Sequence, residues 1–405
     1  MIRKIFVAVA ALLYLPWSVV SAENLAIVNA NLFDGVNDRI RSNTTVVIRD
    51  NLIEVVGGAD TRIPASYEII DAEGNYLMPG LFDVHTHIDT LDQARRALDS
   101  GVTTVRTGSV PAYQDVAMRE LVRSGKLAGP DVVAAGVFVT PNLGNTVLAD
   151  PRLTELHDGV TSDEALRLLV RINAERGTDV IKTRGTQRAG LPDTDPRQQV
   201  YTERQLRVII EEASQYDMPV MVHAHGDEGA RAAVLAGARS IEHGTYLSDE
   251  TLRLMKKRGT WMVPTYVTMD EMNEEQYDYV LRLRGKHMVP QLERAIRKAY
   301  ELGVPIATGA DNYYDKNSIN RISIEVEQFV RLGMTNFDAL QTATVSAAAL
   351  LGIDDQTGHI EKGMEADMIL VPANPLQHIE ALQYVLLVVS NGQVALTRIP
   401  FGVPE

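Results

Sequence analysis

Residues 179–223 contain one complete strand–helix–strand unit: Asp179-Val-Ile-Lys-Thr183, a helical segment over 202–215, and Pro219-Val-Met-Val-His223. The two short apolar runs are typical of buried strands. The segment between them begins with Thr202-Glu-Arg-Gln205, a capping box, and continues with apolar side chains at helical spacing. Two strands joined through a helix in this way are expected to pair in parallel.

The same alternation extends in both directions from this unit. Beginning with Leu81-Phe-Asp-Val-His85, about eight strand–helix units fit into residues 79–356. That number and length predict an α/β protein whose central domain is a closed (β/α)8 TIM barrel. The other strands are expected at 102–106, 131–135, 240–243, 261–264 and 305–308, and the other helices at 163–176, 227–236, 248–258, 288–302 and 335–351.

Both ends of the chain are rich in short β-type runs instead. Residues 23–78 and 357–405 are therefore expected to combine into one small β-sandwich-like domain. The acidic stretch 267–288 follows a strand end, where either a lid or a solvated helix would fit.

Residues 1–22 have the features of a secretory signal peptide. Arg3 and Lys4 precede an apolar run, and Val20-Ser-Ala22 supplies the small residues that signal peptidase requires. We expect cleavage after Ala22, which would change the formal net charge from −14 to −16. A membrane anchor is the alternative, but Pro16 and the small residues disfavour it. The expected product is secreted or periplasmic, without stable membrane insertion.

Composition excludes several classes of protein. The chain has 405 residues, 45% of them hydrophobic, so a large core can form and extensive disorder is excluded. Its acidic charge argues against nucleic-acid binding. The absence of cysteine excludes disulfides, thiolate metal sites and a cysteine nucleophile. The expected partner is a small-molecule substrate.

Histidines and one aspartate gather where predicted strands end. His85 and His87 are two residues apart, as are His223 and His225, so each pair can point to one side of its strand. Barrel active sites are built at these strand ends. A single histidine there could be structural, but ligand-type residues at four strand ends indicate a metal site. His243 and Asp311 are the ligand-type residues at the other two of these strand ends.

Lys182 lies among apolar residues on a predicted strand. Burial disfavours an ammonium group and lowers its pKa. One interpretation is a lysine paired with a buried carboxylate. The other is a neutral amine that captures carbon dioxide as a carbamate, whose two oxygens could bridge two cations.

These motifs resemble the amidohydrolase superfamily. Within it, they look like the binuclear metal-dependent branch that includes Xaa-Pro dipeptidases (prolidases) and ochratoxin-type amidases. The similarity covers nearly all of the chain after residue 22. The matching stretches are Met78-Pro-Gly-Leu-Phe-Asp-Val-His-Thr-His87, Val222-His-Ala-His-Gly226, Ser240-Ile-Glu-His-Gly-Thr-Tyr-Leu247, Ala307-Thr-Gly-Ala-Asp311 and Gly358-His-Ile-Glu-Lys-Gly-Met-Glu-Ala-Asp-Met-Ile-Leu370.

The resemblance implies a role for each residue. His85, His87 and Asp311 would bind the more buried metal, and His223 and His243 the more exposed one. Lys182, as a carbamate, would bridge both metals together with a hydroxide. His225 would then face the substrate; spacing alone does not choose between His223 and His225. Relatives of this branch are often oligomeric, so a homo-oligomer is implied as well.

The donor types support this assignment independently. Nitrogen and oxygen ligands without thiolate suit Zn²⁺, with Mn²⁺ and Co²⁺ as alternatives. Two such cations would acidify the bridging water and polarise a carbonyl group. The hydroxide would attack the acyl carbon, and Asp311 would pass its proton to the leaving group. The predicted activity is cleavage of an amide bond in a dipeptide or an N-acyl amino acid.

The substrate pocket departs from the usual pattern of the branch. The lysine strand is often followed by a Ser-Gly-Gly-type loop, but this chain has Lys182-Thr-Arg-Gly-Thr-Gln-Arg-Ala-Gly190. Arg184 or Arg188 could pair with a substrate carboxylate, or both could be solvated at the surface. The further pocket candidates are Tyr266, Asn312, Tyr313 and Tyr314.

Other functions remain open from the sequence. The same site could hydrolyse esters, lactones or carbamates. A mononuclear deaminase is a further alternative, but such relatives usually lack the bridging lysine. A non-catalytic scaffold is disfavoured because all six metal ligands are present.

Overall fold

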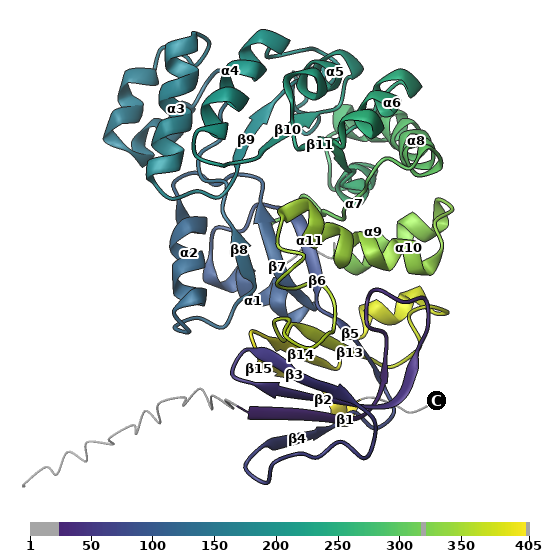
Figure 1. The fold of residues 1–405 in the computed structure, drawn as a ribbon. Helices are drawn as coiled ribbons and strands as arrows, with labels where there is room; N and C mark the ends of the chain where they lie inside the picture. The colour runs from purple at the N-terminus through teal and green to yellow at the C-terminus, as the bar shows by residue number, and fades with distance from the viewer. Residues whose placement is uncertain (1–23, 317–320, 402–405) are drawn as a thin grey trace, which may run out of the picture.

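The structure, a computed structural model, describes residues 24–316 and 321–401. Strands from both ends of the chain form one eight-stranded sheet, here called the β domain, at the bottom of Figure 1. The strand order is β15-β14-β13-β5-β1-β2-β3, and β4 pairs with β1 in parallel. The strands are β1 (Asn24–Leu32), β2 (Arg41–Arg49), β3 (Leu52–Gly57), β4 (Glu68–Asp71), β5 (Tyr76–Pro79), β13 (Met368–Val371), β14 (Leu387–Ser390) and β15 (Gln393–Thr397).

Strand β13 explains how the β domain attaches to the rest of the molecule. All four of its side chains are fully buried. Met368 and Leu370 pack into the core of the β domain, whereas Ile369 and Val371 pack into the larger core above it. Successive side chains of a strand point to opposite faces, so a strand between two cores has to be apolar at every position.

The residues above the β domain form a mixed α/β domain with two parallel sheets. One sheet has the order β6-β7-β8 and the other β12-β11-β10-β9. Isolated parallel bridges, Val139 to Thr183, Met262 to Ile306 and Thr86 to Asn312, connect the two sheets and the segment 305–312. The strands are β6 (Leu81–Thr86), β7 (Val102–Thr107), β8 (Asp131–Val133), β9 (Ile181–Arg184), β10 (Val220–Ala224), β11 (Ser240–His243) and β12 (Trp261–Val263).

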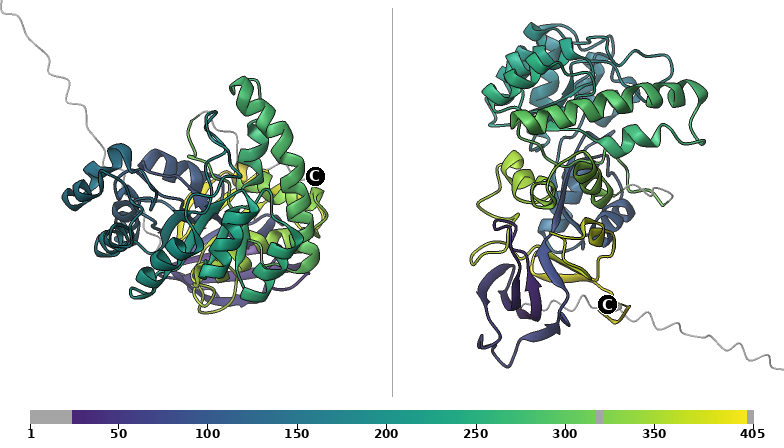
Figure 2. Two further views of the ribbon diagram at one scale, coloured as in Figure 1. Left: turned by 90° about the horizontal axis from the view of Figure 1, so that it is seen from above. Right: turned by 90° about the vertical axis from the view of Figure 1, so that its right-hand side faces the viewer.

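Helices surround these parallel strands, and the long helix α8 extends along one side (Figure 2). The predicted capping box at Thr202 is present, with Thr202 accepting from the Gln205 N–H. The helices are α1 (Leu91–Asp99), α2 (Gln114–Arg123), α3 (Asp163–Glu175), α4 (Glu203–Ser214), α5 (Asp227–Ala236), α6 (Asp249–Arg258), α7 (Tyr266–Glu271), α8 (Tyr279–Leu302), α9 (Ile322–Arg331), α10 (Asn336–Thr342) and α11 (Val345–Leu351), with 3-10 turns at Gly144–Ala149, Pro151–Leu156, Ile379–Gln383 and Ile399–Phe401.

The helix predicted over 335–351 is divided into α10 and α11. The carbonyl of Thr342 accepts the Thr308 N–H at 2.9 Å, and the carbonyl of Ala343 accepts the Phe82 N–H at 2.8 Å. Both carbonyls are therefore engaged by other parts of the chain and do not continue one helical ladder. The sequence pattern could not show this, because the donors are more than thirty residues away along the chain.

Two further differences concern the segments before and after α8. The acidic stretch 267–288 contains most of α7 and the start of α8, so the helix begins before the predicted residue 288 and includes Pro290. The strand predicted at 305–308 is represented by the isolated bridge at Ile306.

None of the helices in the described ranges has the length and hydropathy of a membrane span. The predicted signal peptide, residues 1–22, lies outside those ranges.

Glu325 on α9 should make stability depend on pH. It is fully buried and accepts the N–H groups of Tyr266 and Val267, both at 2.8 Å. Burial raises its pKa to about 8, although the two N–H groups oppose the shift. Between about pH 4.5 and 8, the folded protein thus keeps the Glu325 proton, whereas the unfolded chain loses it. The free energy of unfolding therefore falls as pH rises through this window.

We expect this group to lower the free energy of unfolding by up to about 1.4 kcal/mol per pH unit within that window. Urea denaturation of the chelator-treated protein at several pH values, compared with Glu325→Gln, measures the difference in slope. Glu361→Gln, at a largely exposed glutamate, is the control. Equal slopes for the wild type and Glu325→Gln would contradict the prediction.

Candidate metal centre

The structure brings all six predicted metal ligands together at the ends of the parallel strands. His85 lies on β6, Lys182 on β9, His223 on β10 and His243 on β11. His87 directly follows β6, and Asp311 lies in the segment that bridges back to β6. Two groups of potential ligand atoms result, each within 4.8 Å of one another: His85, His87 and Asp311 in one group, and His223, His225 and His243 in the other.

The first group is held together by contacts among its three residues and by contacts with the neighbouring residues 108 and 109. Asp311 Oδ1 lies 3.0 Å from His87 Nε2 and 3.5 Å from His85 Nε2. His87 Nδ1 is 2.9 Å from the carbonyl of Ser109, which leaves Nε2 for the centre. Gly108 allows the close approach, because a Cβ at that position would lie 2.7 Å from His85 Nε2.

A buried ion pair orients His85. Its Nδ1 lies 2.8 Å from Glu242, and Glu242 pairs with Arg106 at 3.0 Å. Arg106 also donates to the Val84 carbonyl at 2.7 Å. A carboxylate on one ring nitrogen of a histidine fixes its tautomer and raises its basicity as a metal ligand. Glu242 and Arg106 therefore prepare His85 Nε2 for a cation.

The second group consists of three buried imidazoles. His225 Nδ1 lies 2.9 Å from Thr245 Oγ1, and His243 Nδ1 lies 2.7 Å from Thr265 Oγ1. The rings of His225 and His243 are stacked with centroids 4.5 Å apart. All three histidines, His223, His225 and His243, place a ring nitrogen in this group. The assignment of His223 to the metal and of His225 to the substrate therefore stays a prediction.

Lys182 lies against the first group. Its side chain is 2% exposed, and its Nζ is 3.1 Å from His85 Nε2. Burial lowers the pKa of Lys182 to about 8, with Glu242 and Asp311 opposing the shift. The Lys182 amine therefore lies beside the first ligand group, next to His85 Nε2.

The protonation states of the cluster suit metal binding. Burial lowers the pKa of His85 to about 4 and of His225 to about 3, and lowers the pKa values of His223 and His243 well below the usual range. Burial alone would raise the pKa of Asp311, but His85 and His87 outweigh it and lower that pKa. Neutral imidazoles and an ionised carboxylate are the forms that bind metal.

Backbone conformation also marks this site. His243 and Asp311 both adopt left-handed geometry, with φ of 74° and 48°. Such values are uncommon for residues other than glycine and cost of the order of 1–3 kcal/mol each. The two residues provide ligand atoms for different groups of the cluster. The donor set, the tautomers and this backbone geometry together fit a site for divalent cations with nitrogen and oxygen ligands.

The predicted substrate residues take different positions. Arg184 lies on β9 beside Lys182, and Arg188 lies in the following loop. The Tyr266 hydroxyl donates to Glu293 at 3.0 Å, outside the cluster. Asn312 accepts the Tyr314 N–H at 2.7 Å through its side chain.

Two tyrosines that follow Asp311 differ sharply from each other. Tyr313 is half-exposed and stacks on His87 with centroids 5.2 Å apart. Tyr314 is fully buried and donates to Asp83 at 2.8 Å. Tyr313 thus presents an exposed ring beside His87, whereas Tyr314 supports the strand that carries His85.

Sequence reasoning missed three residues that shape the site: Arg106, Glu242 and Phe138. A charged residue inside an apolar strand was the available signal for Arg106 in Val102-Thr-Thr-Val-Arg106 and for Glu242 in Ser240-Ile-Glu-His243. Phe138 gave no signal, because its role depends on arginines more than forty residues later in the chain.

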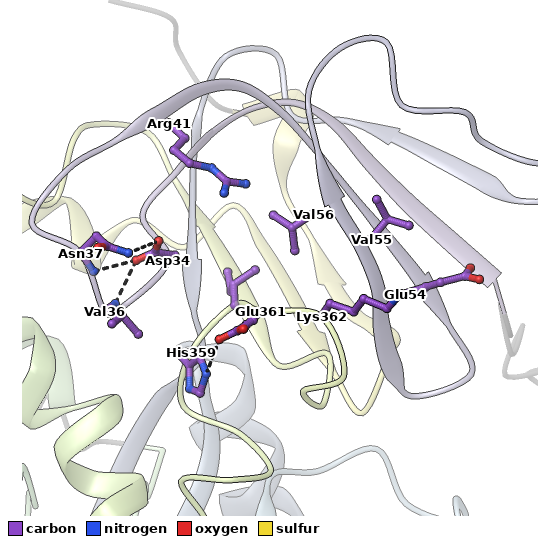
Figure 3. Close-up of a pocket in the computed structure, with 11 residues that line it drawn as sticks. Asp34, Val36, Asn37, Arg41, Glu54, Val55, Val56, His359, Glu361 and Lys362 are labelled. Atoms are coloured by element: carbon purple, nitrogen blue, oxygen red, sulfur yellow. Dashed lines mark hydrogen bonds and ion pairs between the residues drawn. The ribbon is translucent and has the colours of Figure 1, made fainter.

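A separate hollow of about 530 Å³ lies in the β domain (Figure 3). It is lined by residues of both signs of charge, among them Asp34, Arg41, Glu54 and Lys362. It shares no residue with the histidine cluster.

Comparison with known proteins agrees with this geometry. The model of the amidohydrolase family matches residues 76–395. The chain belongs to the amidohydrolase family. As a member of this family, it is a hydrolase that acts on amide C–N bonds.

Several relatives of this amidohydrolase have been described. Ochratoxinase from Aspergillus niger is 28% identical over 406 residues, covering 87% of this chain and 82% of that protein. Its crystal structure superposes with a TM-score of 0.78 at 26% identity, covering 93% and 96% of the two chains. A crystal structure of a Xaa-Pro dipeptidase with bound methionine gives a TM-score of 0.82 at 29% identity, covering 92% and 99%. These comparisons confirm the predicted family and its prolidase- and ochratoxinase-like members.

Proposed function

We propose that this amidohydrolase is an exported binuclear metalloenzyme that cleaves an amide bond in a dipeptide or an N-acyl amino acid. The observation that carries the proposal is the pair of three-residue ligand groups with Lys182 against one of them. A single cation would leave one group of buried, neutral histidines without a function. The similarity to a dipeptidase and to ochratoxinase supports an amide substrate.

Each residue of the cluster then has a defined role. His85, His87 and Asp311 would hold one divalent cation, His223 and His243 the other, and Lys182 as a carbamate would join them. Zn²⁺ is proposed, with Mn²⁺ and Co²⁺ as alternatives; such cations acidify a water molecule and polarise a carbonyl group. Asp311 would accept the proton of the attacking water and deliver it to the departing amine.

We also infer that the parallel strands close into a (β/α)8 barrel. Three isolated bridges link the two sheets and the segment 305–312. The Val84 N–H donates to the Thr308 carbonyl at 3.0 Å, and the Ala307 N–H donates to the Met262 carbonyl at 3.1 Å. These bonds extend from β12 through the segment to β6, as closure requires.

Export and assembly are proposed on separate grounds. The pattern of residues 1–22 supports secretion or transport to the periplasm. Mass spectrometry of the exported protein should find Glu23 at its N-terminus. The resemblance to an often oligomeric branch supports a homo-oligomer, which sedimentation would test.

The test of the proposed function begins with metal content. The protein purified without chelator should hold about two divalent cations per chain. Chelation should lower kcat/KM for a panel of dipeptides and N-acyl amino acids by at least about 10³-fold, and added Zn²⁺ with bicarbonate should restore it. The control is His378→Asn, at an exposed histidine outside the cluster, which should retain both metals.

The outcomes separate the alternatives. Faster turnover of aryl esters, lactones or carbamates than of any amide would favour the alternative that the same site hydrolyses esters, lactones or carbamates. One cation per chain with deamination would favour a mononuclear deaminase. Absence of bound metal, with no uptake from solution, would overturn the proposal.

A further inference from the structure

Two guanidinium groups stack against one aromatic ring beside the metal centre. The Arg184 guanidinium carbon lies 4.5 Å from the ring centroid of Phe138, and that of Arg188 lies 5.7 Å from it. Lys182 Nζ lies 6.0 Å from the same centroid. We call Phe138, Arg184 and Arg188 the arginine stack.

Neither arginine of the stack has an acidic partner within residues 24–316 and 321–401. Arg184 Nε is buried and has no hydrogen-bond partner among these residues. By contrast, the buried Arg106 in the same domain is paired with Glu242. A partly buried guanidinium without an acidic partner, with a second cation beside it, is stabilised when an anionic ligand approaches.

The stack faces the reaction site. Residues two apart on a strand point to the same side, so Arg184 projects from β9 on the side of Lys182. Arg184 is the register partner of His223 on the neighbouring strand β10, and Lys182 lies near the ring on which both arginines stack. An anion bound between the guanidiniums would therefore lie next to the ligand cluster.

The loop that carries Arg188 is held in place by helix α8. Arg284 donates to the carbonyls of Ala189 at 2.5 Å and Leu191 at 2.6 Å, and also to that of Thr194. Only three residues separate Arg188 from Arg184, and both guanidiniums already stack on Phe138 without a ligand. Preorganisation of this kind lowers the entropic cost of binding.

We propose that the arginine stack binds a side-chain carboxylate of the substrate, so that the preferred substrates are dipeptides or N-acyl derivatives of an acidic amino acid. This inference rests on the proposed function, whose substrates already carry one carboxylate. The two guanidiniums, which lack an acidic partner among the described residues, can balance two negative charges, and a second carboxylate supplies the other one. Guanidinium groups bind carboxylates through parallel hydrogen bonds and discriminate against the uncharged amide.

The experiment compares substrates that differ only in that charge. For the metal-loaded enzyme, kcat/KM for Ala-Glu should exceed that for Ala-Gln by about tenfold or more. Calorimetric titration with L-glutamate and L-glutamine gives a second readout that does not depend on turnover, and glutamate should bind more tightly. Arg188→Met, at an exposed position, should reduce both preferences, and Arg184→Met should remove them. Arg184→Lys should retain part of each.

Arg204→Met is the matched control. Arg204 is an exposed arginine paired with Asp163, so this variant removes one positive charge outside the site. It should leave both preferences unchanged. Equal binding of glutamate and glutamine, or preferences that survive Arg184→Met and Arg188→Met, would overturn the arginine-stack proposal. Turnover of Ala-Glu and Ala-Gln at equal rates would overturn it while supporting the proposed amide hydrolysis. Absence of turnover with a retained glutamate preference in binding would instead count against the hydrolytic function alone.

Discussion

Lys182→Met is expected to reduce the bound metal from about two cations per chain to one or none, and to lower kcat/KM by about 10³-fold or more. The methionine side chain has a similar length, but it cannot form a carbamate. It leaves His85 Nε2 without the neighbour that lies 3.1 Å away in the wild type. Replacing the buried Lys182 amine by an apolar side chain of similar length should not prevent folding, because it removes a polar group from the interior.

Elemental analysis and steady-state kinetics of the same preparation measure the two effects. Lys257→Met, at an exposed lysine on α6, is the control and should retain metal and activity. A Lys182→Met variant that keeps two cations and full activity would show that the lysine does not join the metals. Retention of one cation with substantial activity would favour a mononuclear mechanism.

Arg106→Met is expected to destabilise the protein by about 3–5 kcal/mol, because it leaves the buried Glu242 carboxylate without its partner. Glu242 is fully buried, and Arg106 contributes most to lowering its pKa to about 2 against the effect of burial. Arg106 also donates to Ser240 Oγ at 3.3 Å. Loss of the guanidinium therefore removes several contacts and exposes an uncompensated charge to a low dielectric.

The double variant Arg106→Met/Glu242→Gln should recover part of this loss, since it removes the unpaired charge as well. Urea denaturation of the wild type, both single variants and the double variant gives the coupling energy. Glu242→Gln should also weaken metal binding by about 10–100-fold, because Glu242 orients His85 Nδ1. Arg204→Met again serves as the control. A cost below about 1 kcal/mol for Arg106→Met would show that the pair is not coupled in this way.

Local sequence patterns predicted much of the site because strand ends impose their own geometry. Parallel strands bring their carboxyl ends to one edge, so His85, Lys182, His223 and His243 converge whatever the details of the loops. The capping box at Thr202 and the helix over 227–236 depend on neighbouring residues alone, and the structure contains both. The chain-end strands could likewise be identified from their apolar runs, and their combination into one β domain was expected, but the order of the strands in the sheet was not.

Other features required the tertiary structure because they depend on contacts between distant residues. The carboxylate that lies 2.8 Å from His85 Nδ1 belongs to Glu242 on another strand, and the charge of Glu242 is balanced by Arg106 on a third. The break between α10 and α11 follows from N–H donors on other segments. Most clearly, the sequence left Arg184 and Arg188 undecided between solvent and substrate.

The sequence by itself thus determined the alternation of strands and helices and the set of candidate ligands, because these depend on periodicity and spacing within short segments. It indicated the family through the resemblance of its motifs. Only the tertiary structure decided which ring nitrogen of His85 faces the centre, which buried charge lies beside this histidine, and that Arg184 and Arg188 both stack on Phe138. Hydrogen bonding, burial and charge balance act between residues that lie tens of positions apart in the chain. Local sequence patterns therefore cannot predict them.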